Sequence, residues 1–509
     1  MYFGDWLSRW NVYNPQKVAL IDYGLPEGSR AITPSPKEYT YAELYRRSNR
    51  AAHFLKNRGV GRGDRVAVLA QNGIEHVDLF FATAKLGALL VPLNYRLPIG
   101  GLQYILTDTS PAVFFSSQEY EETAKSLART TACPEPLSLE TEFEAAIKDG
   151  DASFPEEIRL EQTDPHLILY TSGTTGHPKG ALITHGQIIW NSINTAISLS
   201  LTKDDRGTIH TPIYHTGGLN VLATPLFHFG GQVVLLRRWD CEAFLSIIEK
   251  HRLTLFFGLP TLFKMMIASP KFKTTNFSSV RIVLSGGEPC PRSVLDTFVE
   301  RGMPIRQGYG LTEVGPNVYS LPAEDAVRKA GSVGFPNFHV DAKIVDERMK
   351  EVPVGHVGEL VMAGPMVCGG YWQKPAATTE AIVDGWFRTG DLFRQDEEGY
   401  YYVVGRKKDM YISGGENVYP VEIENVLHRH PAILEAAVIG VPDEIWGEVG
   451  KAFIALRLGQ SATVDEIRHY LVKHLAKYQV PKYYVFLESL PKGDTGKILK
   501  KELANVKHE

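Results

Sequence analysis

Short apolar runs alternate with amphipathic stretches along the first 116 residues of the chain. Thr40 and Glu43 form a capping box that predicts a helix running to about Leu55. Beyond it, apolar runs and helical spacing predict strands at 64–69, 89–93 and 112–115 and helices at 74–86 and 101–106. This alternation is typical of a mostly parallel, doubly wound α/β sheet.

A second α/β pattern extends over residues 187–307. It predicts helices at 240–251 and 261–268 and strands at 254–257 and 281–284. The last strand runs into a glycine-containing segment, and open α/β sheets bind ligands outside the carboxyl ends of their strands. The polar, acidic residues 118–163 are expected to cover the surface. The glycine- and proline-punctuated segment 333–404 predicts a small β-barrel or a distorted sheet.

The charged segment 405–409 follows an apolar run and predicts a domain boundary. Beyond it, the pattern predicts helices at 421–429 and 463–475 and strands at 436–440, 451–456 and 483–487. We therefore expect an α/β protein. Residues 1–404 form a large N-terminal domain of doubly wound sheets plus the small barrel, and residues 410–509 form a small α+β C-terminal domain.

Composition limits the classes of function. The 509 residues are 44% apolar and 22% charged, with a formal net charge of −4, which gives no reason to expect nucleic acid or an anionic membrane surface as partner. The four cysteines are widely spread, which argues against a disulfide framework or a zinc site. The N-terminus lacks the pattern of a signal peptide, and the longest apolar stretch, 218–236, is interrupted by polar residues. We expect a cytoplasmic protein without integral membrane association, and the sequence allows a homodimer.

One loop combines glycines, hydroxyls and a lysine: YTSGTTGHPKG, residues 170–180. Its backbone amides, Thr and Ser hydroxyls and Lys179 can surround phosphate oxygens. Apolar strands are expected on both sides, so the loop lacks the following helix of a Walker motif. Taken alone, it is also consistent with a flexible surface turn.

Six spaced motifs together resemble the adenylate-forming superfamily, which includes acyl-CoA synthetases, aryl-CoA ligases, luciferases and adenylation domains. The first three are YTSGTTGHPKG (170–180), QGYGLTE (307–313), and GEL (358–360) together with GGYW (369–372). The other three are WFRTGD (386–391), GRKKD (405–409) together with the segment 414–424, and PKGDTGK (491–497). The resemblance covers residues 40–503. It implies that ATP and a carboxylic acid form an acyl-adenylate with Mg²⁺, and that coenzyme A then displaces AMP.

The resemblance assigns roles to the motif residues. Glu313 is the magnesium ligand, Thr312 contacts the α-phosphate and Lys497 is the catalytic lysine, while Asp391 and Arg406 lie at the ribose. The nucleotide site also includes Thr171, Ser172, Gly173, Thr174, Thr175, Gly176, Lys179, Gly287, Glu288, Pro289, Gln307, Gly308, Tyr309 and Gly310. Lys408 matches a hinge within 405–409, and rotation of a mobile lid domain brings Ser413, Gly414 and Gly415 to coenzyme A.

The expected acyl pocket follows the segment PIYHTGGLN, residues 212–220. His215 matches a position near the substrate carbonyl. The pocket is completed by Gly217, Gly218, Asn220, Phe257, Val314 and Pro316. No aspartate stands in this segment to meet the ammonium of an amino acid, and the walls favour a hydrophobic fatty or aryl acid over a dicarboxylate, with Asn220 available to a substrate hydroxyl. Two departures from the family pattern, His177 and Glu288, leave the catalytic groups in place.

Two alternatives remain open from the sequence. The same fold can transfer the acyl group to an amine or a carrier-protein thiol, although no carrier domain follows Lys497. A non-catalytic nucleotide-binding protein would be expected to show damaged motifs, and none is visible.

Overall fold

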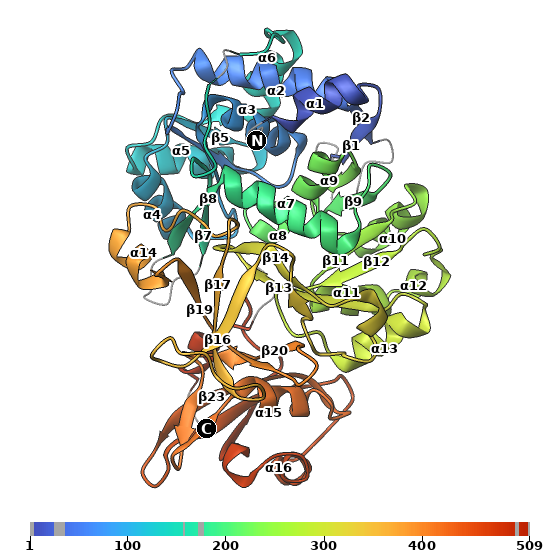
Figure 1. Ribbon diagram of the computed structural model, residues 1–509, viewed down its shortest axis with the longest axis vertical. Coiled ribbons are helices and arrows are strands. Elements are labelled where there is room, and N and C mark those ends of the chain that lie inside the picture. Colours follow the sequence, from blue (N-terminus) through green and yellow to red (C-terminus); the bar gives the residue numbers. More distant parts are fainter. Residues whose placement is uncertain (1–4, 25–35, 156–157, 172–177, 494–497, 507–509) are drawn as a thin grey trace.

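The computed structural model describes residues 5–24, 36–155, 158–171, 178–493 and 498–506. A six-stranded sheet occupies one end of the molecule (Figure 1), in the order β6-β5-β3-β4-β7-β8. Its strands are β3 (Arg65–Leu69), β4 (Leu89–Pro92), β5 (Val113–Ser116), β6 (Leu137–Ser138), β7 (Pro165–Thr171) and β8 (Lys179–Thr184). All neighbours are parallel except β7 and β8, which confirms that the loop of residues 170–180 joins two strands.

The helices of this end begin with α1 (Trp6–Tyr13) and α2 (Tyr41–Lys56), whose expected capping box is present. The others are α3 (Ile74–Leu86), α4 (Ile99–Thr109), α5 (Glu121–Thr130) and α6 (Glu144–Asp149), with the short turns η1 (Gln118–Tyr120) and η2 (Leu139–Phe143). Residues 118–163 were expected to cover the surface; most of the described ones are exposed or partly exposed, and several apolar ones are buried. Leu127, Phe143 and Ile147 are buried, because the turns and helices of this segment close one edge of the core.

Two further sheets form the second α/β region. The first has the order β2-β1-β10-β9, and the second has the order β11-β12-β13-β14-β15. The strands are β1 (Val18–Tyr23), β2 (Lys37–Thr40), β9 (Arg206–Ile209), β10 (Gln232–Leu236), β11 (Leu255–Gly258), β12 (Ile282–Ser285), β13 (Ile305–Leu311), β14 (Gly315–Ser320) and β15 (Phe335–Pro336). Their helices are α7 (His185–Leu199), α8 (Thr216–Leu219), α9 (Ala223–Phe229), α10 (Cys241–Lys250), α11 (Pro260–Ala268), α12 (Pro270–Thr274) and α13 (Arg292–Glu300).

The segment expected as a small barrel or distorted sheet is an antiparallel sheet with register shifts in β17 and β19. Its order is β16-β17-β19, with β18 and β20 both paired to β19, and the ladders of the described residues do not close into a ring. The elements are η3 (Ala323–Asp325), β16 (Asp341–Val345), β17 (Val357–Ala363), α14 (Pro375–Ala381), β18 (Ile382–Val383), β19 (Trp386–Gln395) and β20 (Tyr401–Arg406).

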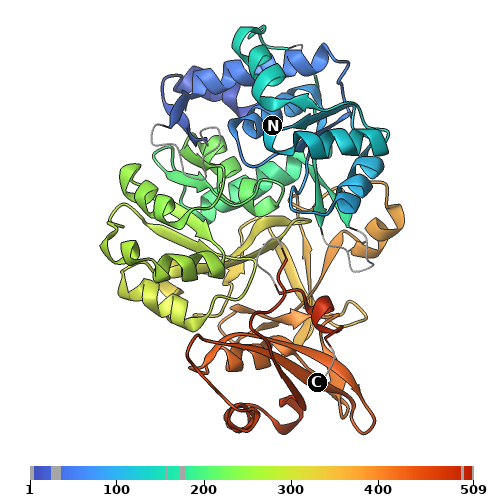
Figure 2. The same cartoon turned by 180° about the vertical axis from the view of Figure 1, so that it is seen from behind.

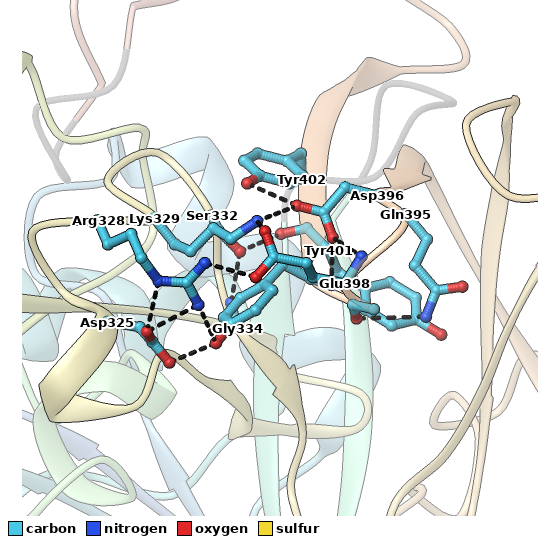
Figure 3. Close-up of polar contacts among 12 residues, drawn as sticks. Asp325, Arg328, Lys329, Ser332, Gly334, Gln395, Asp396, Glu398, Tyr401 and Tyr402 are labelled. Atoms are coloured by element: carbon cyan, nitrogen blue, oxygen red, sulfur yellow. Dashed lines mark hydrogen bonds and ion pairs between the residues drawn. The ribbon is translucent and has the colours of Figure 1, made fainter.

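An ion-pair network braces the turn between β19 and β20 (Figure 3). Lys329 lies 2.8 Å from Asp396 and also pairs with Glu398, while Arg328 joins Asp325 to Glu398. The Lys329 side chain is largely shielded from solvent, so its pairs are screened less than those of the half-exposed Arg328. The network therefore fixes the base of β20, the strand that leads out of the N-terminal region.

The C-terminal region forms a separate sheet at the opposite end of the molecule (Figures 1 and 2). It contains β21 (Tyr411–Ser413), β22 (Glu416–Val418), β23 (Ile433–Asp443), β24 (Gly447–Leu456) and β25 (Tyr483–Phe486), with α15 (Pro420–Leu427), α16 (Val464–Val472), η4 (Lys477–Gln479) and α17 (Lys500–Leu503). The expected helices and strands are all present within a few residues, and β21 and β22 are additional. Among the described helices, none combines the length and apolar character needed to cross a bilayer.

Candidate active site

A tyrosine–aspartate–arginine group joins three strands at the centre of the molecule. The Tyr309 hydroxyl on β13 donates to Asp391 Oδ2 at 2.6 Å, and Arg406 Nε on β20 lies 3.0 Å from Asp391 Oδ1. Asp391 and Arg406 are register partners across β19 and β20, so the sheet itself sets their contact. Burial and the neighbouring carboxylate raise the pKa of Tyr309, which keeps the phenol protonated as a donor.

A second group forms around Glu313, whose carboxylate is almost fully buried. Tyr371 Oη donates to Glu313 Oε1 at 2.9 Å, and Thr171 Oγ1 donates to the same oxygen at 3.4 Å. Burial raises the pKa of Glu313, and the Tyr371 hydrogen bond opposes that shift. Lys179 Nζ lies 5.2 Å from the centre of the Tyr371 ring. The structure thus brings the two ends of the glycine-rich loop to the expected magnesium ligand.

The charge of Arg406 connects the two groups. Its guanidinium acts electrostatically on both Asp391 and Glu313, although only Asp391 is within ion-pair distance. The predicted ribose and phosphate residues therefore share one site. Ser172, Gly173, Thr174, Thr175, Gly176 and His177 lie outside the described residues.

Sequence reasoning missed Tyr371 and Gln187 as site residues. Tyr371 reaches Glu313 because the segment after Cys368 pairs with β8, through an Ala181–Tyr371 bridge and a Trp372 N–H to Gly180 carbonyl bond of 2.7 Å. The GGYW motif contained that signal. Gln187 on α7 donates from Nε2 to the carbonyl of Thr312 at 2.8 Å and so fixes the backbone next to Glu313. No local pattern distinguished Gln187.

The expected adenine wall lies at the carboxyl end of β12. A Cβ on Gly286 would lie 3.5 Å from the carbonyl oxygen of Gly308, an ordinary van der Waals contact, so this end of β12 lies against β13. Gly287 adopts a φ of 82°, which favours glycine, and is followed by Glu288 and Pro289. The Gln307 side chain instead donates to the Ser332 carbonyl at 3.3 Å, so it stabilises the strand rather than extending toward a ligand.

Part of the expected acyl pocket is present. A Cβ on Gly217 would lie 3.8 Å from Phe257, and one on Gly286 would lie 3.5 Å from the same ring. A narrow cavity adjoins this ring. Its lining comprises Thr195, Leu199, Phe257, Leu284, Ser285, Gly286, Arg306, Gln307, Gly308, Pro316, Asn317, Tyr319 and Ser320. Phe257 and Pro316 therefore line a common cavity, and His215 precedes α8 beside the buried ring of Tyr214.

Three other expected pocket residues serve the backbone or the core. A Cβ on Gly218 would lie 2.2 Å from the Pro212 carbonyl oxygen, so a tight chain turn requires glycine at this position. Asn220 is buried and bonded through its side chain to Thr216 and Thr224, which occupies the group expected to meet a substrate hydroxyl. Val314 is fully buried in the hydrophobic core around β14 and β17. Gly310 also relieves a backbone contact, since its Cβ would lie 2.2 Å from the Pro316 carbonyl oxygen.

The predicted catalytic residue Lys497 lies outside the described residues, and the chain on either side of its segment is fixed. A bridge joins Lys492 to Ile498, and the Leu499 N–H donates to the Pro491 carbonyl at 2.8 Å. Lys492 pairs with Glu435 of β23. Lys264 of α11 is electrostatically coupled to Glu435, Lys492 and Glu288, so this part of the C-terminal region faces the N-terminal region.

The segment expected as a hinge begins at the end of β20. The Lys407 N–H donates to the Gly390 carbonyl at 2.9 Å, and the N–H groups of Asp409 and Met410 donate to the Arg406 carbonyl. Lys408 is exposed, and burial of part of its side chain together with Arg406 lowers its pKa. Ser413 is buried at the end of β21, and Gly414 and Gly415 form the turn to β22 with φ values of 60° and 87°.

The described residues contain no group of three or more histidine, cysteine or carboxylate side chains that could bind a metal by itself. Mg²⁺ bound with a nucleotide commonly uses one or two protein carboxylates together with phosphate oxygens and water. Glu313, with two hydroxyls beside it, is a donor of the required oxygen type.

Comparisons with known proteins agree with this site. A family model described as AMP-binding enzyme matches residues 7–372, and a model described as AMP-binding enzyme C-terminal domain matches residues 422–497. The chain therefore belongs to the AMP-binding enzyme family, which is the adenylate-forming superfamily that its motifs resemble.

The relatives specify the class of reaction. The chain is 41% identical to a feruloyl-CoA synthase of Amycolatopsis sp, over 91% of this chain and 93% of that protein. It is 38% identical to an indoleacetate–CoA ligase of Aromatoleum aromaticum, over 95% and 96%. It is thus an AMP-forming acyl-CoA synthetase, an acid–thiol ligase that uses ATP to form an acyl-adenylate and then transfers the acyl group to coenzyme A.

Solved structures agree on the fold. ATP-bound MatB from Rhodopseudomonas palustris aligns with a TM-score of 0.89 at 31% identity, covering 99% of this chain and 98% of that one. The apo form of MatB aligns with a TM-score of 0.80 at 32% identity and the same coverage. The overall arrangement of this chain is therefore closer to the ATP-bound form of that enzyme.

Proposed function

We propose that the groups around Asp391 and Glu313 form one adenylation site in which ATP reacts with an aryl carboxylic acid. The observation that carries this proposal is the buried Glu313 carboxylate, which receives hydroxyls from Thr171 and Tyr371 next to the charge of Arg406. A buried carboxylate with these neighbours suits a site where phosphate charge must be balanced.

In the first step, the residues hold the nucleotide so that its α-phosphate faces the acid. Asp391 accepts from the ribose hydroxyls, the Tyr309 ring lies against adenine, and the backbone at Gly286 and Gly287 forms the facing wall. Lys179 and the loop that it follows hold the leaving pyrophosphate. Glu313 holds Mg²⁺, which when bound supplies charge neutralisation on the phosphates. Lys497 offsets the repulsion between the attacking carboxylate and the phosphate.

In the second step, coenzyme A must reach the same carbonyl carbon. Rotation of residues 410–509 about Lys408, within the hinge 405–409, withdraws Lys497 and brings Ser413, Gly414 and Gly415 to the thiol's approach. Support comes from the exposure of Lys408 and from the two-glycine turn between β21 and β22. A hinge needs only a few positions that absorb the backbone change.

The substrate class is an aryl acid. The names of both relatives, feruloyl-CoA synthase and indoleacetate–CoA ligase, contain aryl acids. Gly217 and Gly286 lie beside opposite edges of the Phe257 ring, so no side chain at these two positions stands next to it. An aromatic ring of a substrate can stack against the Phe257 ring.

The test combines both half-reactions. Purified protein is assayed for acid-dependent exchange of labelled pyrophosphate into ATP, and then for acyl-CoA by mass spectrometry, over fatty and aryl acids. We expect exchange and thioester with aryl acids, and loss of both in Glu313→Gln with the fold retained. Products with an amine or carrier protein but not with coenzyme A would contradict the acceptor, and preference for fatty acids would contradict the substrate class. Light scattering on the same samples would show whether the protein is a homodimer.

A further inference from the structure

A buried arginine, Arg306, lines the cavity next to Phe257 and has no role in the proposed reaction. Phe257, Leu284 and Arg306 are register partners on three neighbouring strands, so their side chains lie side by side on one face of the sheet. Helix α7 covers that face, and its Thr195 and Leu199 line the same cavity. The sheet and the helix therefore enclose a space with an aromatic ring on one strand and a cation two strands away.

Arg306 is only 8% exposed. Glu324 acts on its charge electrostatically, but no carboxylate of the described residues forms an ion pair with it. Its Nε donates to the Leu321 carbonyl at 2.8 Å, and its Nη2 donates to the Ser198 carbonyl at 3.3 Å. No acceptor for Nη1 is present in the described part of the chain. A guanidinium has five N–H groups, so this buried charge keeps donors that the protein does not satisfy. Nη2 also lies 3.5 Å from Ser198 Oγ, and Nη1 is not among the fully buried unpaired atoms, so water or a ligand in the cavity can reach it.

The position of Arg306 relative to the nucleotide site gives the depth of the pocket. Thr312, which follows the end of β13 at Leu311, lies six residues after it. Six residues span at most about 20 Å when extended, and the register shift between Tyr309 and Leu311 shortens that span. Pro316 and Gly308, which line the cavity, lie toward the same end. A substrate whose carboxylate is at the α-phosphate would therefore present its far end to Arg306.

We propose that Arg306 selects acids that carry an oxygen acceptor at the end remote from the reacting carboxylate, with a carboxylate preferred to a hydroxyl. This rests on the proposed acyl pocket and refines it. A purely apolar acid leaves the guanidinium donors unpaired, whereas a carboxylate accepts two of them in a planar, charge-assisted contact. The sequence favoured a hydrophobic acid over a dicarboxylate. A selective role for Arg306 reverses that preference and keeps only the apolar middle of the acid.

The test uses three acyl-sulfamoyl-adenosines, stable analogues of the acyl-adenylate, made from 4-methyl-, 4-hydroxy- and 4-carboxycinnamic acid. Their dissociation constants are measured by calorimetry for the wild type and for Arg306→Met. The wild type is expected to bind the 4-carboxy compound about tenfold to a hundredfold more tightly than the 4-methyl compound. In Arg306→Met this ratio is expected to fall to about one, mostly through weaker binding of the 4-carboxy compound.

Two variants control for structural effects. Arg281→Met removes an arginine that also donates to a carbonyl of α7, Leu199 O at 2.8 Å, but does not line the cavity; its binding ratio should equal that of the wild type. Arg306→Lys keeps the positive charge and is measured in place of Arg306→Met if that variant does not fold. Its preference for the 4-carboxy over the 4-methyl compound should lie between those of the wild type and Arg306→Met. An unchanged ratio in the folded Arg306 variants, or a wild type that prefers the 4-methyl compound, overturns the proposal. Because binding is read without turnover, a wild type that shows the ratio but no pyrophosphate exchange would contradict the proposed function and leave this inference standing.

Discussion

The hydroxyl of Tyr309 donates to Asp391 at 2.6 Å, across strands that lie more than 80 residues apart in the chain. The same carboxylate is held by Arg406 from the neighbouring strand. Two donors orient Asp391 before any nucleotide arrives, and such preorganisation reduces the ordering required on binding. The Tyr309–Asp391 hydrogen bond thus connects β13 with β19, the strand that pairs with β20 before the predicted hinge.

Removing the charge of Asp391 should weaken nucleotide binding. In Asp391→Asn, kcat/KM for ATP in the pyrophosphate exchange assay is expected to fall about tenfold to a hundredfold, because hydrogen bonds to a charged group are lost. Tyr309→Phe should have a smaller effect, since Arg406 still holds the carboxylate. Unchanged kinetics for ATP in Asp391→Asn would refute the ribose contact.

Tyr371 should tune the ionisation of Glu313. Its hydrogen bond lowers a pKa that burial raises, so Tyr371→Phe should raise the pKa of Glu313 further. The carboxylate must be ionised to hold Mg²⁺, so the acid limb of the exchange activity should move to higher pH, and more Mg²⁺ should be needed. The control is Tyr484→Phe, because Tyr484 packs against the core of the C-terminal sheet and its buried hydroxyl has no partner in the described structure. An identical pH profile in Tyr371→Phe and the wild type would count against this coupling.

The two half-reactions should separate by mutation. Lys497→Ala is expected to reduce adenylation by at least about a hundredfold while sparing thioester formation from a preformed acyl-adenylate, since electrostatic stabilisation acts on the first step. Lys408→Pro should do the reverse, because proline restricts the backbone at the hinge. Single-turnover assays of each step give the comparison. Equal losses in both steps for Lys497→Ala would argue against its assigned role.

Glu435 should position the chain that carries Lys497. It pairs with Lys492. Lys492 in turn forms a β-bridge with Ile498, and the segment that contains Lys497 lies between these two residues. We expect Glu435→Gln to slow adenylation about tenfold, the effect of one weakened charged hydrogen bond, without changing thioester formation. A matched control is Glu466→Gln in the capping box of α16, which should lower stability only. Equal effects of both substitutions on adenylation would show a general loss of structure.

Acid should destabilise the protein through its buried neutral histidines. Burial lowers the pKa of His76 and of His210 to about 3, against about 6.5 in an unfolded chain. Between these values the unfolded state binds more protons, so the free energy of unfolding falls as the pH falls from about 6.5 toward 3. Urea unfolding at several pH values should show a smaller slope in His76→Gln than in the wild type. Substitution of the exposed His356 should leave the slope unchanged.

Local sequence accounts for much of the fold. Capping boxes begin α2 and α16 where expected, and apolar periodicity gives the strands of the parallel sheets, because burial on both faces makes such strands continuously apolar. The strands β1 and β2 were not expected, and β1 pairs with β10 more than 200 residues away. That pairing depends on a distant partner that no local pattern contains.

The candidate site divides in the same way. Thr171, Glu313 and Asp391 could be named from motifs, because phosphate and metal chemistry requires specific residue types in short segments. The assignment of Asn220, Gly218 and Val314 to the acyl pocket stays a prediction, and each of them also serves a helix, a turn or the core.

The sequence by itself determined the class of chemistry, from the glycine-rich loop of residues 170–180 to the lysine at 497. Only the tertiary structure decided what surrounds each charge. It brought the Tyr371 hydroxyl to the Glu313 carboxylate through the pairing of β8 with a distant segment. It also put Arg306 on the same face of the sheet as Phe257, two strands away, through the register of three strands. Burial and register arise from contacts between segments far apart in the chain, and these set the ionisation of a carboxylate and the polarity of a pocket.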